Sequence, residues 1–239
     1  METIKTILVS KVFYYIGGRM ERDELVRKRI LKSSLRLFYS RGFSRVTTQE
    51  IAGALGISKK TLYTYFSSKN EIVMAALSAN FEGLGKRIDA VFNEEDRPFD
   101  WKLTALLSIS RMQISNISLV LIEDMHRYLP EAWEMIDRFR REHLLNRLGR
   151  LIRQGKEEGF IRNSIDVDAA LFLVFGIINH VFRPENLINQ KHSTHSLFST
   201  FISLLYGGLF EPERFEEFSR AMDIFNLEEL HVTEGDFIE

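Results

Sequence analysis

Apolar residues recur at helical spacing along most of this chain, and this periodicity limits the fold more than any other feature. Over residues 22–41, for example, Val26, Ile30 and Leu37 lie four and seven positions apart, with charged residues filling the other side. Such spacing places apolar side chains on one face of an α-helix. The alternation typical of a β-strand never extends beyond four residues, and only 4 Pro and 14 Gly are present. The sequence therefore predicts an all-α fold.

Two short helices are predicted within residues 47–66. Thr47 and Glu50 have the spacing of a capping box, in which each side chain binds a free backbone N–H at the start of a helix. Gly56 ends that helix, because glycine readily adopts the left-handed conformation of a helix terminus. Ser58 can cap the second helix, which we expect to run to residue 66.

A longer series of helices is expected around this pair. Gly42 provides a stop for the first helix, and Ser68 and Glu71 have the spacing of a second capping box, which opens a long helix. Further along, Gly159 and Pro184 mark helix exits. The longer helices expected from these signals cover residues 22–41, 69–92, 98–114, 119–127, 131–158, 166–182 and 193–210.

The formal net charge of −1 conceals a strong asymmetry along the chain. Residues 22–69 carry eleven Lys or Arg and three acids, a net charge of +8, whereas residues 211–239 carry ten acids against Arg214 and Arg220. A basic segment on a nearly neutral chain is typical of a nucleic-acid-binding module. A solvated basic face is the alternative interpretation.

The second short helix divides its residues in the way that a DNA-reading helix requires. Leu62 and Phe66, four positions apart, form its inner face, and Ala52 is small where the two helices must cross closely. Polar residues on the outer face can reach base edges and phosphates in a major groove. These outward residues are Lys59, Lys60, Thr61, Tyr63 and Tyr65. Ordinary packing is the alternative for the two tyrosines, although Tyr63 is expected to point outward.

Five motifs occur in order in this part of the chain. They are LF at residues 37–38, GF at 42–43, TTQEIA at 47–52, LGISKKTLYTYF at 55–66 and SKNE at 68–71. On these motifs, residues 29–77 resemble the DNA-binding domain of the tetracycline-repressor (TetR) family of transcription regulators. The family often has glycine where Lys60 stands, and this departure leaves the base preference open.

The resemblance implies a domain order and a set of DNA contacts. A helix-turn-helix DNA-binding domain over residues 22–79 would precede a helical ligand-binding and dimerisation domain over residues 80–239. Residues 1–21 would form an N-terminal extension, unless translation starts at Met20. The residues implied as DNA contacts are Thr47, Thr48, Lys59, Lys60, Thr61, Tyr63, Tyr65, Lys69 and, as a secondary candidate, Arg45.

The resemblance also implies how the protein assembles and acts. It would form a homodimer through helices 166–182 and 193–210, and bind a palindromic operator in double-stranded DNA. A buried intramolecular core is the alternative for these two helices. Repression of transcription, controlled by a small-molecule ligand, is the usual activity of the family.

A ligand pocket is expected among residues 99–183. Polar residues on otherwise apolar stretches are the candidates for lining it, with surface exposure or ordinary packing as the alternative for each. They are Arg111, Asn116, Glu123, His126, His143, Asn179 and His180, with Gln113 and Tyr128 in the wider set. The 19 phenylalanines favour an apolar or aromatic ligand.

Several function classes are disfavoured by what the sequence lacks. Cysteine is absent, which excludes disulfides and cysteine-based metal sites and makes a reducing cytoplasm the simplest setting. No nucleotide-binding glycine loop or Gly-x-Ser-x-Gly motif occurs, so we expect neither an enzyme nor a cofactor. His192 and His195 are interpreted as surface residues rather than metal ligands. No apolar run reaches the length of a membrane span.

Two further expectations concern the alternative function and the acidic tail. A DNA-organising protein without a ligand could use the same helix-turn-helix, but it would pack its C-terminal domain solid, so a sizeable cavity would argue against it. In the tail, Phe215, Phe218, Met222 and Phe225 have helical spacing, which predicts an extra helix packed on the body.

Overall fold

The computed structural model describes residues 2–115, 118–216 and 218, and it confirms the all-α prediction. Within these residues the only β-type pairing is an isolated bridge between Ile161 and Phe210. The elements in chain order are α1 (Glu2–Arg41), α2 (Thr48–Leu55), α3 (Lys59–Tyr65), α4 (Lys69–Asn93), α5 (Phe99–Ser115), α6 (Leu119–Tyr128), α7 (Glu131–Phe139), the π-helical turn η1 (Arg140–Leu145), α8 (Asn146–Glu157), α9 (Val167–Val181), α10 (Pro184–Asn189) and α11 (Thr194–Leu209).

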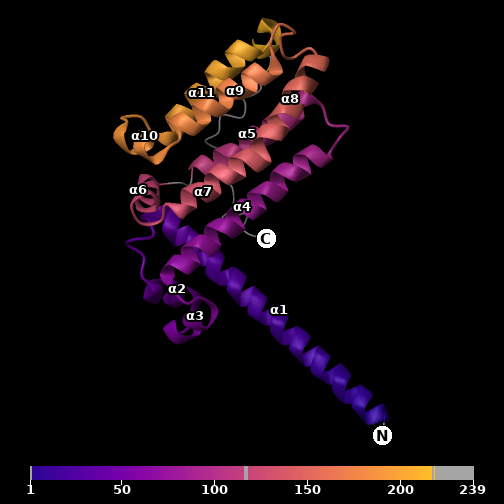
Figure 1. The fold of residues 1–239 in the computed structure, drawn as a ribbon, viewed down its shortest axis with the longest axis vertical. Helices are drawn as coiled ribbons and strands as arrows, with labels where there is room; N and C mark the ends of the chain where they lie inside the picture. The colour runs from indigo at the N-terminus through magenta and orange to yellow at the C-terminus, as the bar shows by residue number, and fades with distance from the viewer. Residues whose placement is uncertain (1, 116–117, 217, 219–239) are drawn as a thin grey trace.

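The helices form a small head and a larger body (Figure 1). Helices α2 and α3 lie at one end with the C-terminal part of α1 and the start of α4, and α9 and α11 lie at the opposite end. The core of the head is built from side chains that are almost completely inaccessible to solvent. They include Ile30, Leu35, Phe38, Ile51, Leu62, Phe66 and Ile72.

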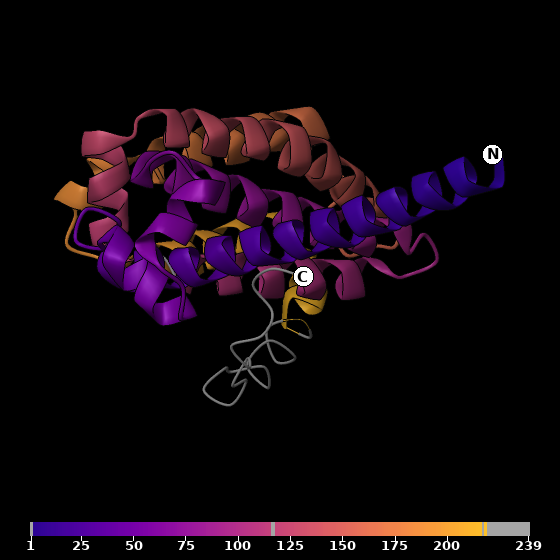
Figure 2. The ribbon, with the colours of Figure 1, turned by 90° about the horizontal axis from the view of Figure 1, so that it is seen from below.

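Helix α1 is longer than the pattern of its apolar residues predicted. It begins at Glu2 rather than near residue 22, and Gly17 and Gly18 do not interrupt it. Figures 1 and 2 show its N-terminal part extending beyond the rest of the molecule. Gly42 ends the helix with a φ of 73°, as expected of a glycine terminus.

Helix α4 runs from the head into the body and packs against α1, α5 and α7. The body has its own apolar core, formed by α4, α5, α8 and α11, and Phe215 and Phe218 of the acidic segment pack against it. This packing agrees with the extra helix predicted there, since residues 212–216 are helical. Met222 and Phe225 lie outside the described residues.

Two details of the body differ from the prediction. The single helix expected over residues 131–158 is α7 and α8 separated by η1, because a π-helical turn holds more residues than an α-helical turn and leaves little trace in apolar spacing. Pro184 follows the end of α9 at Val181, as predicted, but it also opens the short helix α10, which was not predicted and where its missing N–H costs nothing. No helix in the described part of the chain is long and apolar enough to cross a membrane.

Candidate functional site

The two short helices of the head begin and end as their sequence predicted. Thr47 accepts a hydrogen bond from the backbone N–H of Glu50 at 3.2 Å, and the Glu50 carboxylate accepts one from the N–H of Thr47 at 2.7 Å. Gly56 ends α2 with a φ of 66°, and Ser58 accepts from the N–H of Thr61 at 2.9 Å to start α3. These local bonds fix the direction in which α3 leaves the turn.

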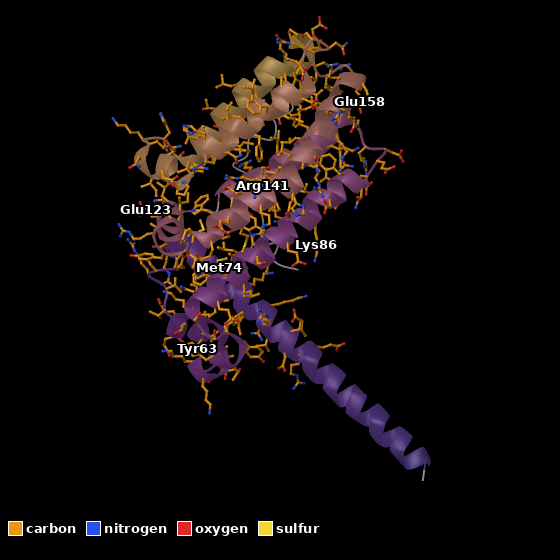
Figure 3. All side chains as sticks on the ribbon, in the orientation of Figure 1. Tyr63, Met74, Lys86, Glu123, Arg141 and Glu158 are labelled. Carbon is orange, nitrogen blue, oxygen red and sulfur yellow. The ribbon has the colours of Figure 1, made fainter. Side chains whose placement is uncertain are left out.

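The outer surface of α3 carries basic and aromatic side chains. Leu62 and Phe66 are buried, whereas Lys59 and Lys60 are exposed and 43% of Tyr63 is accessible to solvent (Figure 3), so the predicted division is confirmed for these residues. Thr61 and Tyr65, also predicted to face outward, are half-buried, and Tyr65 packs against the core of the head. The Lys59 ammonium lies 5.8 Å from the centre of the Tyr63 ring. A cation over an aromatic face is held there without being neutralised.

Other predicted DNA contacts already take part in bonds within the head. The Tyr65 hydroxyl donates to Asp23 of α1 at 3.0 Å. The Lys69 ammonium donates to the backbone carbonyl of Ser44 at 3.2 Å and to that of Val46 at 3.0 Å. Thr48 is buried, and its hydroxyl lies 3.5 Å from that of Tyr63. Arg45 is exposed in the loop before α2.

The start of α4 departs from the predicted capping box. Ser68 accepts from the N–H of Glu71 at 3.1 Å, but the Glu71 carboxylate binds the N–H and the hydroxyl of Ser67, at 2.6 and 2.7 Å, instead of Ser68. The hydroxyl and N–H of Ser67 hold the pKa of Glu71 below its usual value. The prediction was therefore right that Ser68 caps α4, and wrong that the Glu71 carboxylate binds the N–H of Ser68.

The body contains a cavity of about 240 Å³ that is partly open to solvent. Its walls come from α4, α5, α6, α7, η1, α8, α9, α10 and α11, so residues from Phe81 to Tyr206 contribute to it. Most of the lining is apolar. Its polar or charged members include Ser110, Gln113, Arg140, Arg147 and Thr194.

The residues predicted as ligand contacts lie elsewhere. Among the described residues that line the cavity, none is a member of that set, although Gln113 of the wider set is present. Glu123, His126 and His180 are exposed, Arg111 and Asn179 are half-buried, His143 stacks on Phe139, and Asn116 lies outside the described residues. The lining residues Arg140 and Arg147 were missed, because arginines on an amphipathic helix usually belong to a solvated face.

Two hydrogen bonds join the walls of the cavity to the head. The Gln113 side-chain amide in α5 donates to the Tyr39 hydroxyl in α1 at 3.0 Å, and burial raises the pKa of Tyr39 to about 12, which keeps this hydroxyl neutral. In α6, Ile122 and Met125 line the cavity, and Asp124 accepts from the backbone N–H of Ser44 at 2.7 Å. Both bonds cross from the body to the head.

An open groove of about 700 Å³ lies between α9 and α11, on the opposite end of the molecule from the head (Figure 1). It is lined mainly by apolar residues, and three large side chains of these two helices are largely exposed: Phe172 at 79%, Leu173 at 62% and Leu204 at 73%. Other side chains of the same helices, such as Val174 of α9 and Tyr206 of α11, are buried inside the body. The two helices therefore have an internal and an external apolar face.

Comparison with known proteins agrees with this architecture. A family model for bacterial regulatory proteins of the tetR family matches residues 30–76. The HTH-type transcriptional regulator YvaF of Bacillus subtilis is 31% identical over 192 residues, which cover 78% of this chain and 96% of the relative.

Solved structures share the fold at low identity. A regulator from Saccharomonospora viridis in complex with choline has a TM-score of 0.58 and 20% identity, over 79% of this chain and 99% of its own. The fatty acid degradation regulator FadR from Bacillus halodurans has a TM-score of 0.52 and 22% identity, over 76% and 95% of the two chains. With its basic helix-turn-helix and its match to YvaF along most of both chains, this protein belongs to the TetR family of DNA-binding transcriptional regulators.

Proposed function

We propose that this regulator acts as a homodimeric repressor, whose two heads bind the half-sites of a palindromic operator and whose affinity for DNA falls when a small apolar molecule occupies the cavity. The observation that carries the proposal is the pair of hydrogen bonds between the cavity walls and the head, from Gln113 to Tyr39 and from Ser44 to Asp124. A ligand that displaces α5 or α6 would act on the head directly.

The outer face of α3 would enter the major groove. Its exposed residues include Lys59, Lys60 and Tyr63, with Thr61 near its N-terminal end, and Arg45 is exposed in the loop before α2. Lysine neutralises phosphates and can also bind guanine, while threonine and tyrosine hydroxyls add hydrogen bonds without charge. Thr47 and Thr48 lie at the start of α2; contact of their hydroxyls with the DNA backbone would require Thr47 to release Glu50 and the buried Thr48 to become accessible.

Lys69 and Tyr65 would likewise have to share or exchange the partners that they have within the head. An ammonium has three N–H donors. Lys69 donates two of them to backbone carbonyl groups, which leaves one for a phosphate. The Tyr65 hydroxyl donates its proton to Asp23, so it would have to release Asp23 before donating to a phosphate. We therefore rank Lys60 and Tyr63 above Tyr65 as DNA contacts.

The external face of α9 and α11 would be covered by a second copy of the chain. Large apolar side chains exposed together are unusual on a monomer and typical of an interface between subunits. Pairing through this face leaves both heads free, and paired heads can read half-sites about 34 Å apart, one turn of DNA. The exposed side chains Phe172 and Leu204 would lie within this interface.

Control by a ligand is supported by the cavity itself. A partly open, mainly apolar cavity of about 240 Å³ leaves room for a small molecule, which favours a sensor over a ligand-independent DNA-organising protein that would pack this domain solid. The choline complex of the neighbour from Saccharomonospora viridis is a case of a small molecule bound on this fold. The effect of the ligand on DNA binding equals its difference in affinity for the two states of the head.

The experiment that tests the proposal is salt-dependent binding to DNA from upstream of the protein's own gene, with scrambled DNA as competitor. We expect specific binding whose affinity falls steeply as salt rises. Sedimentation of Phe172→Glu should give a monomer that has lost operator binding, while Leu119→Glu, on an exposed site of α6, should stay dimeric. No binding to any DNA at low salt would contradict the assignment of the head, and a dimeric Phe172→Glu would contradict the assignment of the interface.

A further inference from the structure

We propose that the ligand is an amphipathic anion, with an apolar chain that fills the cavity and an acidic head group held by Arg140 and Arg147. The inference rests on the proposed function, in that it takes the cavity as the ligand site, and it adds the chemical class of the molecule. A carboxylate and a phosphate share the required chemistry, and the experiment below separates them.

The charged groups around the cavity are of one sign. Arg140 and Arg147 contribute positive charge, and the described lining residues include no Asp or Glu. Tyr206 also lines the cavity, and burial raises its pKa, so it stays neutral. An otherwise apolar space with two cations and no acid matches an apolar molecule that carries a negative charge.

Each arginine has an aspartate partner that lies nearer the solvent. The Arg140 guanidinium is 3.5 Å from Asp137, and the side chains are 15% and 38% exposed. Arg147 pairs with Asp89 in the same way, at 17% and 39% exposure. Neither aspartate lines the cavity. In each pair the aspartate is therefore the more exposed member, while the arginine forms part of the cavity wall.

The guanidinium of Arg147 retains a donor that no group among the described residues satisfies. Its Nη1 donates to the carbonyl groups of Glu142 and His143, both at 3.2 Å, and its Nη2 binds Asp89. Its Nε is buried without a hydrogen-bond partner. Burial lowers the pKa of Arg140 and Arg147 alike, which reflects the cost of holding these charges away from water. An anion in the cavity would offset that cost.

The acidic head group would bind at η1, which packs against α4, the helix that runs from the body into the head. Arg140 is the first residue of η1, and Arg147 holds two carbonyls of the same π-helical turn. On this turn, His143 packs against Gly85 of α4, where a methyl group would lie 3.1 Å from its ring. A π-helical turn at a functional position is a common arrangement. Binding of an anion here would therefore act on α4 as well as on the cavity.

Trp133 provides a direct readout, because it lines the cavity, whereas the other tryptophan, Trp101, does not. In Trp101→Phe protein, Trp133 fluorescence would be titrated with decanoate, decyl phosphate, decanol and decyltrimethylammonium, each below its micelle concentration, with homologues of about eight and twelve carbons. We expect one or both acids to bind at least about tenfold more tightly than the alcohol and the ammonium compound. The tighter of the two acids identifies the head group as carboxylate or phosphate.

Arg140→Gln is the principal variant, because Arg147 also holds the backbone of η1. We expect it to remove most of the preference for the acid over the alcohol, and Arg147→Gln to do the same if circular dichroism shows that it folds. Arg141→Gln, which changes an exposed arginine next to the site (Figure 3), should leave the preference unchanged.

The possible failures are distinguishable. If no decyl compound or homologue perturbs Trp133, both the cavity as a ligand site and this inference are wrong. If the alcohol or the ammonium compound binds as tightly as the acids, the cavity remains a ligand site and the anionic class is wrong. If the acids are preferred equally by Arg140→Gln and by the parent protein, the assigned head-group position is wrong.

Discussion

The carboxylate of Asp124 accepts a hydrogen bond of 2.7 Å from the backbone N–H of Ser44. Asp124 is buried in α6, between residues that line the cavity, and Ser44 lies in the loop between α1 and α2. The carbonyl group of Ser44 in turn accepts from the ammonium of Lys69 at 3.2 Å. One residue of the head is thus bound by the body on one side and by the start of α4 on the other.

Replacing Asp124 should show how strongly this bond holds the head to the body. Asp124→Ala is expected to lower the free energy of unfolding by about 1.5–3 kcal/mol, because it removes a hydrogen bond to a charged, buried acceptor. Asp124→Asn keeps an acceptor oxygen and should cost less. Urea denaturation measures both, with Glu123→Ala, an exposed neighbour, as a control expected within about 0.5 kcal/mol of the parent. An Asp124→Ala protein as stable as the control would contradict the role.

Two glycines with the same backbone conformation test how closely α6 packs on the head. Gly42 and Gly56 have φ of 73° and 66°. Gly56→Ala should cost about 1–2 kcal/mol of stability, because an alanine is strained in the left-handed conformation. The added methyl group itself would contact no other atom. At Gly42 the methyl group would also lie 2.5 Å from Asp124 and 2.6 Å from Val120. We expect Gly42→Ala to cost at least about 1 kcal/mol more. If urea denaturation shows that Gly42→Ala and Gly56→Ala lose the same free energy of unfolding, α6 moves aside without cost.

The parts of the molecule that could be predicted from sequence are those set by neighbouring residues. Thr47 and Glu50 form their capping box within one helical turn, and Gly56 and Ser58 end one helix and start the next by local bonds. Such signals depend on residues three or four positions apart, so they are readable without the fold. The recognition helix and its outward lysines followed from them.

The cavity lining could not be predicted, because residues more than a hundred positions apart meet there. Arg140 and Arg147 sit among other arginines of an amphipathic helix, and only the packing of α5, α9 and α11 distinguishes them. His143 was a reasonable ligand candidate by residue type, yet it packs against Gly85 of α4. The π-helical turn shifts which side chains face inward after residue 140, so helical periodicity gave no guide to this part of the site.

The proposed contact of Lys60 with DNA predicts a change in salt dependence. Each phosphate contact contributes about −0.9 to the slope of log affinity against log salt, so Lys60→Ala in a dimer should reduce the slope by about 1.8. Fluorescence anisotropy with labelled operator at several salt concentrations measures it. Lys86→Ala is the matched control, because Lys86 is exposed on α4 in the body, away from α3, and pairs with Glu82 (Figure 3). A Lys60→Ala slope equal to that of Lys86→Ala would show that Lys60 touches no phosphate.

The capping carboxylate of Glu50 predicts how the stability of the head responds to acid. Hydrogen bonds from the N–H and hydroxyl of Thr47 and from Arg41 lower the pKa of Glu50 below its ordinary value of 4.5. Because the folded-state pKa is the lower one, this contribution is complete above the ordinary value and is lost as the pH falls through the folded-state value. Glu50→Gln should therefore be less stable than the parent near neutral pH, and its melting temperature should fall less between about pH 6 and pH 3. Glu123→Gln, on an exposed position of α6, should follow the parent at both ends of this range. If the melting temperature of Glu50→Gln falls as far on acidification as that of the parent, the charge of Glu50 does not stabilise the start of α2.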